Sequence, residues 1–271
     1  MKTLSIAKPS LVLHKRSQQL LKISPIEDKS GVAFWQEMVA KQLKIFNMTH
    51  NTIFKTLLRT SQRAYSMNAQ MMGFMPFPND VVRQEVIPHH CSCSDFFQHD
   101  SRLISTNYPE LQDAIIAASK LVHWRETYKG TNIGTYFTDR FGCFCIIGEN
   151  APFWSDALRL FMVYMPSGLY YPWHHHPAEE SYMVVSGSAT FKKNDCRDEL
   201  LSEGEVSFHA SNQSHAMETS KDPVLCLVAW RNNFQTPPIL TLNTKFSIKW
   251  RWDRSNEYLF QIKLILNKLR Q

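Results

Sequence analysis

The stretch Gly168–Gly187 constrains the fold of this chain more than any other part of the sequence. It holds three consecutive histidines and two glutamates, and apolar β-forming residues lie on both sides of it. Alternate side chains of a strand share one face, so His174 and His176 point together, and Glu180 and Tyr182 share a face of the next strand. Imidazoles and a carboxylate at short spacing suit a divalent metal. The stretch therefore predicts a metal site on neighbouring strands.

The remainder of this metal site has to come from a distant strand. The best candidate for a fourth ligand is His215, which follows a turn at Gly204. The spacing resembles the first motif of the cupin family, which is matched without a gap by Gly168, His174, His176, Glu180 and Gly187. In the second cupin motif, Gly204 and His215 fall in register, whereas Ala210, Asn212 and Thr219 replace the usual proline, glycine and asparagine. The resemblance implies a cupin fold, an antiparallel β-barrel also called a double-stranded β-helix.

The composition indicates a packed domain without a membrane or nucleic-acid partner. Of 271 residues, 44% are hydrophobic and 12% aromatic, which suits one large domain or two modest ones. The net charge of +6 is scattered and forms no basic helix, which favours a solvated basic surface that could attract a carboxylate-bearing ligand. The six cysteines are expected to be free thiols. The sequence shows no signal peptide or membrane span, so we expect a cytoplasmic protein.

Helical patterns dominate the chain before about residue 130. Apolar residues recur at helical spacing over residues 32–46 and 49–72, and Gly73 with the prolines after it ends the second pattern. A further helix is expected from Tyr108 to about Tyr128, with Asn107 as its cap. Residues 81–106 are expected to be irregular.

Short apolar runs separated by turn residues follow from about residue 131. They are expected to be strands and cover residues 133–137, 141–147, 160–165, 182–185, 189–192, 205–209 and 224–230. We therefore predict an α+β protein. It has a mainly helical section over residues 1–130, a cupin β-barrel with the metal site over 131–240, and a tail over 241–271 that contains a short helix. The helical section could cap the barrel or form the interface of a homodimer.

Histidines and cysteines also cluster between residues 89 and 93. A second metal site at His89, His90, Cys91 and Cys93 is one interpretation. Ligands on adjacent residues do not close a tetrahedron easily, however, and no Cys-x-x-Cys pair supports them. The favoured interpretation is a polar loop whose thiols and imidazoles are incidental.

A narrower family resemblance covers roughly residues 107–240. It is carried by Arg140–Cys143, Ala151–Phe153, Phe161–Pro166, Tyr170–Glu180 and Ser214–Thr219, which are similar to segments of the cupin-type dimethylsulfoniopropionate (DMSP) lyases. The resemblance implies that His174, His176, Glu180 and His215 hold the metal and that Tyr182 is the catalytic base. It also implies that Tyr171, as a catalytic and substrate-binding residue, and Trp230 line the substrate pocket. Tyr170 and Trp173 are expected to complete its aromatic wall.

These residue types suit the reaction of that family. Cleavage of DMSP to acrylate and dimethyl sulfide is a β-elimination, in which a base removes a proton next to the carboxylate. A divalent cation (Zn, Fe, Mn, Ni or Co) would acidify that C–H bond and assist ionisation of a nearby tyrosine, and aromatic faces attract a sulfonium. The ligands do not select among these metals. Another cupin enzyme, such as a dioxygenase or an isomerase, or a non-catalytic ligand-binding cupin, would use the same ligands.

Overall fold

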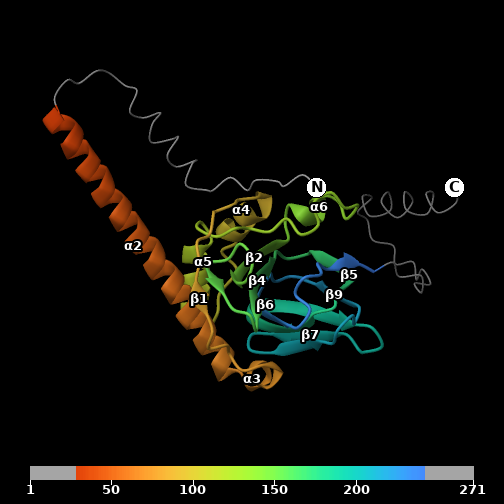
Figure 1. Cartoon of the computed structure of the whole chain (residues 1–271). Coiled ribbons are helices and arrows are strands. Elements are labelled where there is room, and N and C mark those ends of the chain that lie inside the picture. The colour runs from red at the N-terminus through yellow and green to blue at the C-terminus, as the bar shows by residue number, and fades with distance from the viewer. Residues whose placement is uncertain (1–28, 242–271) are drawn as a thin grey trace, which may run out of the picture.

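A long helix lies against a barrel of strands in the computed structural model of the chain (Figure 1). The structure describes residues 29–241, without the side chains of residues 29–34 and 43–47. The helix expected within residues 241–271 lies outside this described range. Among the described helices, none combines the length and the apolar content that a membrane crossing requires.

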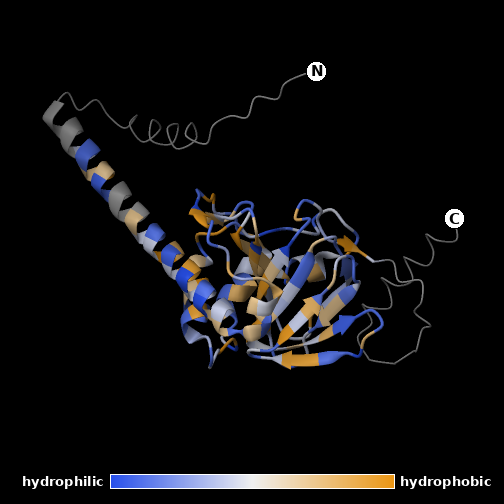
Figure 2. Cartoon of the chain, turned by 60° about the horizontal axis from the view of Figure 1, so that its bottom comes forward, coloured by the Kyte–Doolittle hydropathy of each residue, from blue (hydrophilic) through white to orange (hydrophobic). Residues whose placement is uncertain are grey.

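The helices precede the barrel along the chain, apart from one short turn. They are α2 (Lys29–Met67), α3 (Ala69–Phe74), α4 (Ser92–His99), α5 (Pro109–Ala118) and α6 (Thr135–Thr138). Helix α2 runs without a break through the first helical pattern and most of the second, whose last residues belong to α3. Its second half packs onto the body through Phe54, Leu57 and Tyr65, whereas Trp35 and Val39 in its first half are more than half exposed. Figure 2 shows the second half of α2 lying against the rest of the molecule.

The helix expected to reach about Tyr128 ends at Ala118. Beyond it the chain turns so that Trp124 forms an isolated antiparallel bridge with Phe144. The Trp124 side chain is fully buried and donates its indole N–H to the carbonyl of Ser119. Burial of this large ring against the barrel stabilises the turn more than continued helix would.

The start of α5 also differs from expectation, because Asn107 does not cap it. Tyr108 is the N-cap residue and makes no side-chain capping bond. The carboxylate of Glu203 accepts the backbone N–H groups of Thr106, Asn107 and Tyr108 instead. A residue almost one hundred positions later therefore satisfies the donors that precede this helix.

The strands form one continuous, folded sheet. They are β1 (Val82–Arg83), β2 (Gly142–Ile147), β3 (Phe153–Trp154), β4 (Arg159–Met165), β5 (Tyr170–His175), β6 (Glu179–Lys193), β7 (Glu199–Ser202), β8 (Val206–His209), β9 (His215–Glu218), β10 (Val224–Arg231) and β11 (Ile239–Leu240). They pair in the order β1-β3-β2-β4-β10-β6-β9-β5-β11, and β7 and β8 also pair with β6. Every pair is antiparallel except β2 with β3. The predicted α+β class and antiparallel cupin barrel are confirmed.

Strand β6 joins the two sides of the barrel. The runs at 182–185 and 189–192, expected to be separate strands, both belong to it. Its first part pairs with β8 and β10 and its second part with β7 and β9. Gly187 lies between these parts with a φ of 75°, and a Cβ atom there would lie 1.8 Å from the carbonyl oxygen of Pro223. The last glycine of the first cupin motif is therefore needed where two backbones meet.

Three smaller differences from the sequence-based expectation concern short segments outside the main strands. The run at 133–137 forms the helical turn α6 rather than a strand, and its Phe137 ring stacks on Phe141 at 4.9 Å. The segment 81–106, expected to be irregular, contains β1 and α4. Strand β11 lies beyond the last run expected from the sequence, at 224–230, and pairs with β5. One buried cluster joins side chains of α2 and α5 to those of β2, β4, β6 and β10. The helices therefore pack on the barrel, and a domain boundary at residue 130 stays a prediction.

Candidate metal centre

Three histidines point their free ring nitrogens toward one place inside the barrel. His174 lies in β5, His176 follows its end, and His215 begins β9 directly opposite His174. Each Nδ1 atom lies 2.8 or 2.9 Å from a backbone carbonyl, of Pro172, Ala178 and Gln213 respectively. A carbonyl only accepts, so each Nδ1 carries a proton, and Nε2 keeps its lone pair in a neutral ring. Burial opposes protonation of His176, but Glu180 outweighs burial and raises the pKa of His176, so this ring has to release a proton when an ion binds.

These histidines are close enough to share one ion. Their candidate ligand atoms lie within 4.8 Å of one another, and all three side chains are 2% exposed. The His174 and His215 ring centroids are 4.1 Å apart, and those of His176 and His215 are 5.2 Å apart. Burial lowers the pKa of His174 well below its ordinary value, and the neighbouring His215 acts in the same direction. The imidazole is therefore neutral, as a metal ligand has to be.

The carboxylate of Glu180 lies beside the histidines and is held from several sides. Its Oε2 atom lies 3.5 Å from His176 Nε2, 3.1 Å from His215 Nε2 and 2.8 Å from His209 Nδ1. Its Oε1 atom accepts the indole N–H of Trp230 at 2.5 Å. Burial opposes ionisation, but these neighbours outweigh it and keep the pKa of Glu180 well below its usual range. The site therefore contains a fixed negative charge next to three imidazoles.

This donor set fits a divalent metal. The Nε2 atoms of His176 and His215 are buried and make no hydrogen bond, although Glu180 lies nearby. A buried nitrogen without a partner is costly, and an ion at this point would satisfy both nitrogens. The structure thus brings together all four residues expected to bind the metal, which are His174, His176, Glu180 and His215. Three imidazoles and a carboxylate suit several first-row transition metals.

Two tyrosines lie next to the histidine cluster. Tyr171 is buried, stacks on the His174 ring at 3.9 Å, and its hydroxyl lies 2.7 Å from the hydroxyl of Tyr128. Tyr182 is also buried, and its hydroxyl makes no hydrogen bond within the described part of the chain. Burial, followed by the charge of Glu180, raises the pKa of Tyr182 well above its ordinary value. Tyr182 is therefore neutral unless positive charge is added to the site.

A cavity of about 420 Å³, open solvent at its mouth included, lies beside the cluster. Its lining includes Tyr171, Tyr182 and Trp230, which are three of the predicted catalytic and substrate-binding residues. The Trp230 ring stacks on His176 at 4.2 Å and packs against Phe161 at 5.3 Å. Tyr170 and Trp173 are half-buried and do not line this cavity, so the structure does not bring them to it.

Arg125 also lines the cavity and was not expected from the sequence. Its backbone N–H bonds to the carbonyl of Cys143, and its guanidinium lies 5.3 Å from the centroid of the Phe161 ring. Among the described residues it has no ion pair and no side-chain hydrogen bond. The sequence did not indicate that Arg125 and Tyr128 lie at the site, because both fall in the stretch that was expected to be the end of a helix. A positive group that no described carboxylate pairs with therefore borders the candidate site.

The second group of histidines and cysteines does not form a comparable site. His89 stacks on His123 at 4.9 Å and lies 3.2 Å from Glu126, whereas Cys91 contacts Cys93. Among the described residues, the groups of three or more close candidate metal ligands all belong to the barrel interior.

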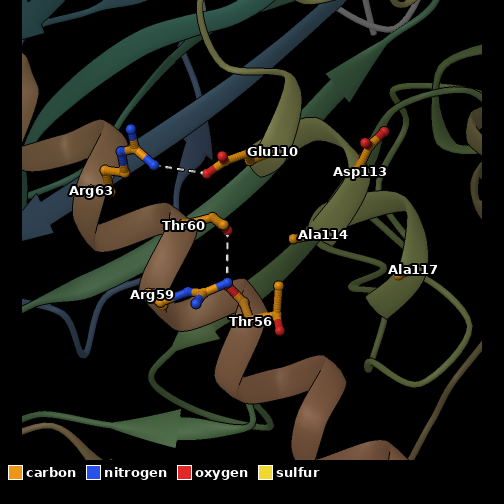
Figure 3. A pocket seen from close by; sticks show the side chains of 8 residues that line it. All are labelled: Thr56, Arg59, Thr60, Arg63, Glu110, Asp113, Ala114 and Ala117. Atoms are coloured by element: carbon orange, nitrogen blue, oxygen red, sulfur yellow. Dashed lines mark hydrogen bonds and ion pairs between the residues drawn. The ribbon is translucent and has the colours of Figure 1, made fainter.

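A larger hollow lies on the surface between α2 and α5. It encloses about 1040 Å³, again with open solvent included, and is lined on α2 by Arg59 and Arg63 and on α5 by Glu110 and Asp113. Figure 3 shows Arg63 and Glu110 pointing toward each other, and their ion pair is mostly exposed. The charged side chains that line the hollow are solvated or paired. The hollow therefore has no reactive group comparable to the histidine cluster in the barrel.

Comparisons with known proteins agree with this geometry. Residues 76–226 match the family described as dimethylsulfoniopropionate lyase. The chain is 40% identical over 188 residues to the dimethylsulfoniopropionate lyase DddQ of Ruegeria pomeroyi, which covers 69% of this chain and 94% of that protein.

Two similar solved structures are also lyases of this kind. The crystal structure of DddQ from Ruegeria pomeroyi DSS-3 matches with a TM-score of 0.69 and 39% identity, over 70% of this chain and 96% of that chain. A crystal structure reported for the DMSP lyases RdDddP and RnDddQII matches with a TM-score of 0.68 and 32% identity, over 71% and 99% of the two chains.

Proposed function

The chain belongs to the dimethylsulfoniopropionate lyase family, and we propose that its barrel cleaves DMSP to acrylate and dimethyl sulfide in a metal-dependent β-elimination. It is therefore a carbon–sulfur lyase that acts on a small molecule. The observation that carries the proposal is the convergence of three buried imidazoles and Glu180 beside a cavity with aromatic walls.

We assign the metal to His174, His176, Glu180 and His215. The ion would be a divalent transition metal, with Zn, Fe, Mn, Ni and Co as candidates. When bound, such an ion attracts the substrate carboxylate and stabilises the negative charge that develops next to it. The backbone carbonyls at each Nδ1 hold the three rings in the required tautomer before any ion arrives.

Tyr182 is proposed as the base. Its hydroxyl is available, because no described residue accepts or donates a hydrogen bond there. It removes the proton next to the carboxylate, the C–H electrons form the carbon–carbon double bond, and the C–S bond breaks to release dimethyl sulfide. Burial and Glu180 hold its proton in place, so the phenolate forms only when the cluster carries positive charge.

The other cavity residues are proposed to orient the substrate. The rings of Trp230 and Tyr171 can hold the sulfonium by cation–π attraction, which contributes about 1–2 kcal/mol when desolvated. The Tyr128 hydroxyl fixes that of Tyr171.

Arg125 is proposed to hold the opposite end of the substrate. A guanidinium that no described carboxylate pairs with attracts the carboxylate of a substrate through charge-assisted hydrogen bonds and repels a sulfonium. The two charges of DMSP would therefore select one direction in the cavity, with the carboxylate toward Arg125. This orientation would keep the sulfonium against the aromatic faces.

The proposal is tested by incubating the protein, loaded in turn with each candidate metal, with DMSP. We expect dimethyl sulfide and acrylate in equal amounts and no oxygen uptake. No sulfide with any of the metals would contradict lyase activity. Oxygen uptake with a catechol or thiol substrate would favour a dioxygenase, and binding without turnover would favour a ligand-binding cupin. Metal analysis of His215→Ala, which should lose the ion, tests the remote ligand.

A further inference from the structure

Two cysteines that the proposed reaction does not use touch each other at the start of α4. The Sγ atoms of Cys91 and Cys93 lie 2.7 Å apart, and both thiols are free. We propose that Cys91 and Cys93 are a redox-active dithiol that closes to an intramolecular disulfide when the protein meets a peroxide. The pair is separate from the barrel site and is independent of the substrate assignment.

The two thiols differ in a way that gives each one a role. Cys91 is half-buried and can meet a small solute, whereas Cys93 is 1% exposed. Cys91 is the N-cap residue of α4 and its side chain makes no capping bond. Its backbone carbonyl accepts from both the N–H and the hydroxyl of Ser94, which fixes the turn. The accessible sulfur therefore lies against a buried partner at the start of the same helix.

The surroundings favour a thiolate at Cys91. The contact with the Cys93 thiol lowers the pKa of Cys91 to about 7, against the effect of burial, and the backbone N–H groups of Ser94 and Cys93 assist. The same contact and burial raise the pKa of Cys93, which stays a thiol. Thiolate character and access determine which cysteine reacts first, so Cys91 is the attacking sulfur.

The chemistry balances with a peroxide as the oxidant. The Cys91 thiol first releases its proton to solvent. The thiolate attacks one peroxide oxygen, the O–O bond breaks, and a sulfenic acid forms as hydroxide leaves and takes up a proton from solvent to become water. The Cys93 sulfur then attacks the Cys91 sulfur, the S–O bond breaks, and the Cys93 proton leaves with the hydroxide as a second water. Two thiols lose two electrons and two protons in total, and a dithiol reductant reverses the change.

The other cysteines supply controls within the same chain. Cys143, Cys145 and Cys226 are buried, and burial raises the pKa of each thiol, that of Cys143 to about 11. Cys196 is exposed and has no neighbouring thiol among the described residues. Cys196 therefore tests whether exposure alone explains peroxide sensitivity.

The test treats the full chain with a small excess of hydrogen peroxide and maps the products by mass spectrometry. We expect the peptide with Cys91 and Cys93 to lose two hydrogen atoms, and the thiols counted after unfolding to fall by two. In Cys93→Ser, Cys91 should stop at a sulfenic acid that dimedone traps, and in Cys91→Ser, Cys93 should stay reduced. The proposal is overturned if Cys196 oxidises while the pair stays reduced, or if Cys91 and Cys93 oxidise without bonding to each other.

Discussion

His209 Nδ1 lies 2.8 Å from Glu180 Oε2, and the two residues face each other in the register of β8 and β6. The ring also stacks on His215 at 4.0 Å, so it contacts two of the proposed ligands. Its other nitrogen lies 3.2 Å from the Ser207 hydroxyl. Burial lowers the pKa of His209 to about 3, so the ring is neutral. It carries a single N–H, which it donates to Glu180. His209 therefore positions Glu180 rather than neutralising it.

This contact predicts a loss of metal affinity in His209→Ala. Partners that orient metal ligands typically contribute about 10- to 100-fold in affinity, and we expect a loss of that size. Competition with a chelating indicator measures it. Ser207→Ala is the matched control, because it removes only the bond on the far side of the ring, and it should keep the original affinity. Equal affinities in His209→Ala and the unaltered protein would refute the positioning role.

Substitution of Arg125 should change the recognition of carboxylates. Arg125→Met is expected to raise KM for DMSP by about 10- to 100-fold, since a desolvated charge-assisted contact is lost. Inhibition by propionate should weaken by a similar factor, whereas inhibition by trimethylsulfonium should stay the same or strengthen. Arg140→Met is the control, because Arg140 also lies over an aromatic ring, at 4.0 Å from Tyr136, but does not line the cavity. Unaltered propionate inhibition in Arg125→Met would exclude the role.

Glu203 should make stability depend on pH. Burial opposes its ionisation, but the bonds from Ser105 and from the backbone N–H groups before α5 outweigh it and lower its pKa. A carboxyl whose pKa is lower in the folded state stabilises above its unfolded pKa and loses that contribution as pH falls through the folded value.

Glu203→Gln should therefore destabilise the fold by about 1–3 kcal/mol at neutral pH, with a smaller difference below about pH 4. Denaturant unfolding at several pH values measures the change. Glu199→Gln, at a half-exposed carboxylate paired with Lys193, is the control and should have little effect. A difference that does not vary with pH would show that the charge of Glu203 is not responsible.

The local part of the site could be predicted from the sequence. His174, His176 and Glu180 stand at short, fixed spacing around one turn, so strand alternation alone predicts their convergence. The prediction of His215 as a ligand needed one further assumption, that the barrel brings the second motif opposite the first. In the structure His215 pairs with His174. The glycine at 187 also followed from the motif, because only a residue without a side chain fits beside Pro223.

The rest of the site depends on strand register and tertiary packing. Trp230, which the family resemblance alone predicted, and His209 flank Glu180 because β10 and β8 pair with β6 at that row. No local spacing encodes this pairing. Arg125 reaches the cavity because burial of Trp124 ends the helical pattern early. The single helix α2, the turn α6 and the role of Glu203 likewise reflect contacts between distant segments.

The rate of dimethyl sulfide release by Tyr182→Phe, per bound metal and relative to the unaltered protein, tests the central claim. This substitution removes one hydroxyl, which has no partner among the described residues, and should leave the ligands in place. We predict that metal content stays the same and that the rate falls by about 10²- to 10⁴-fold, as for loss of a general base. An unchanged rate at full metal content would contradict a reaction driven by Tyr182.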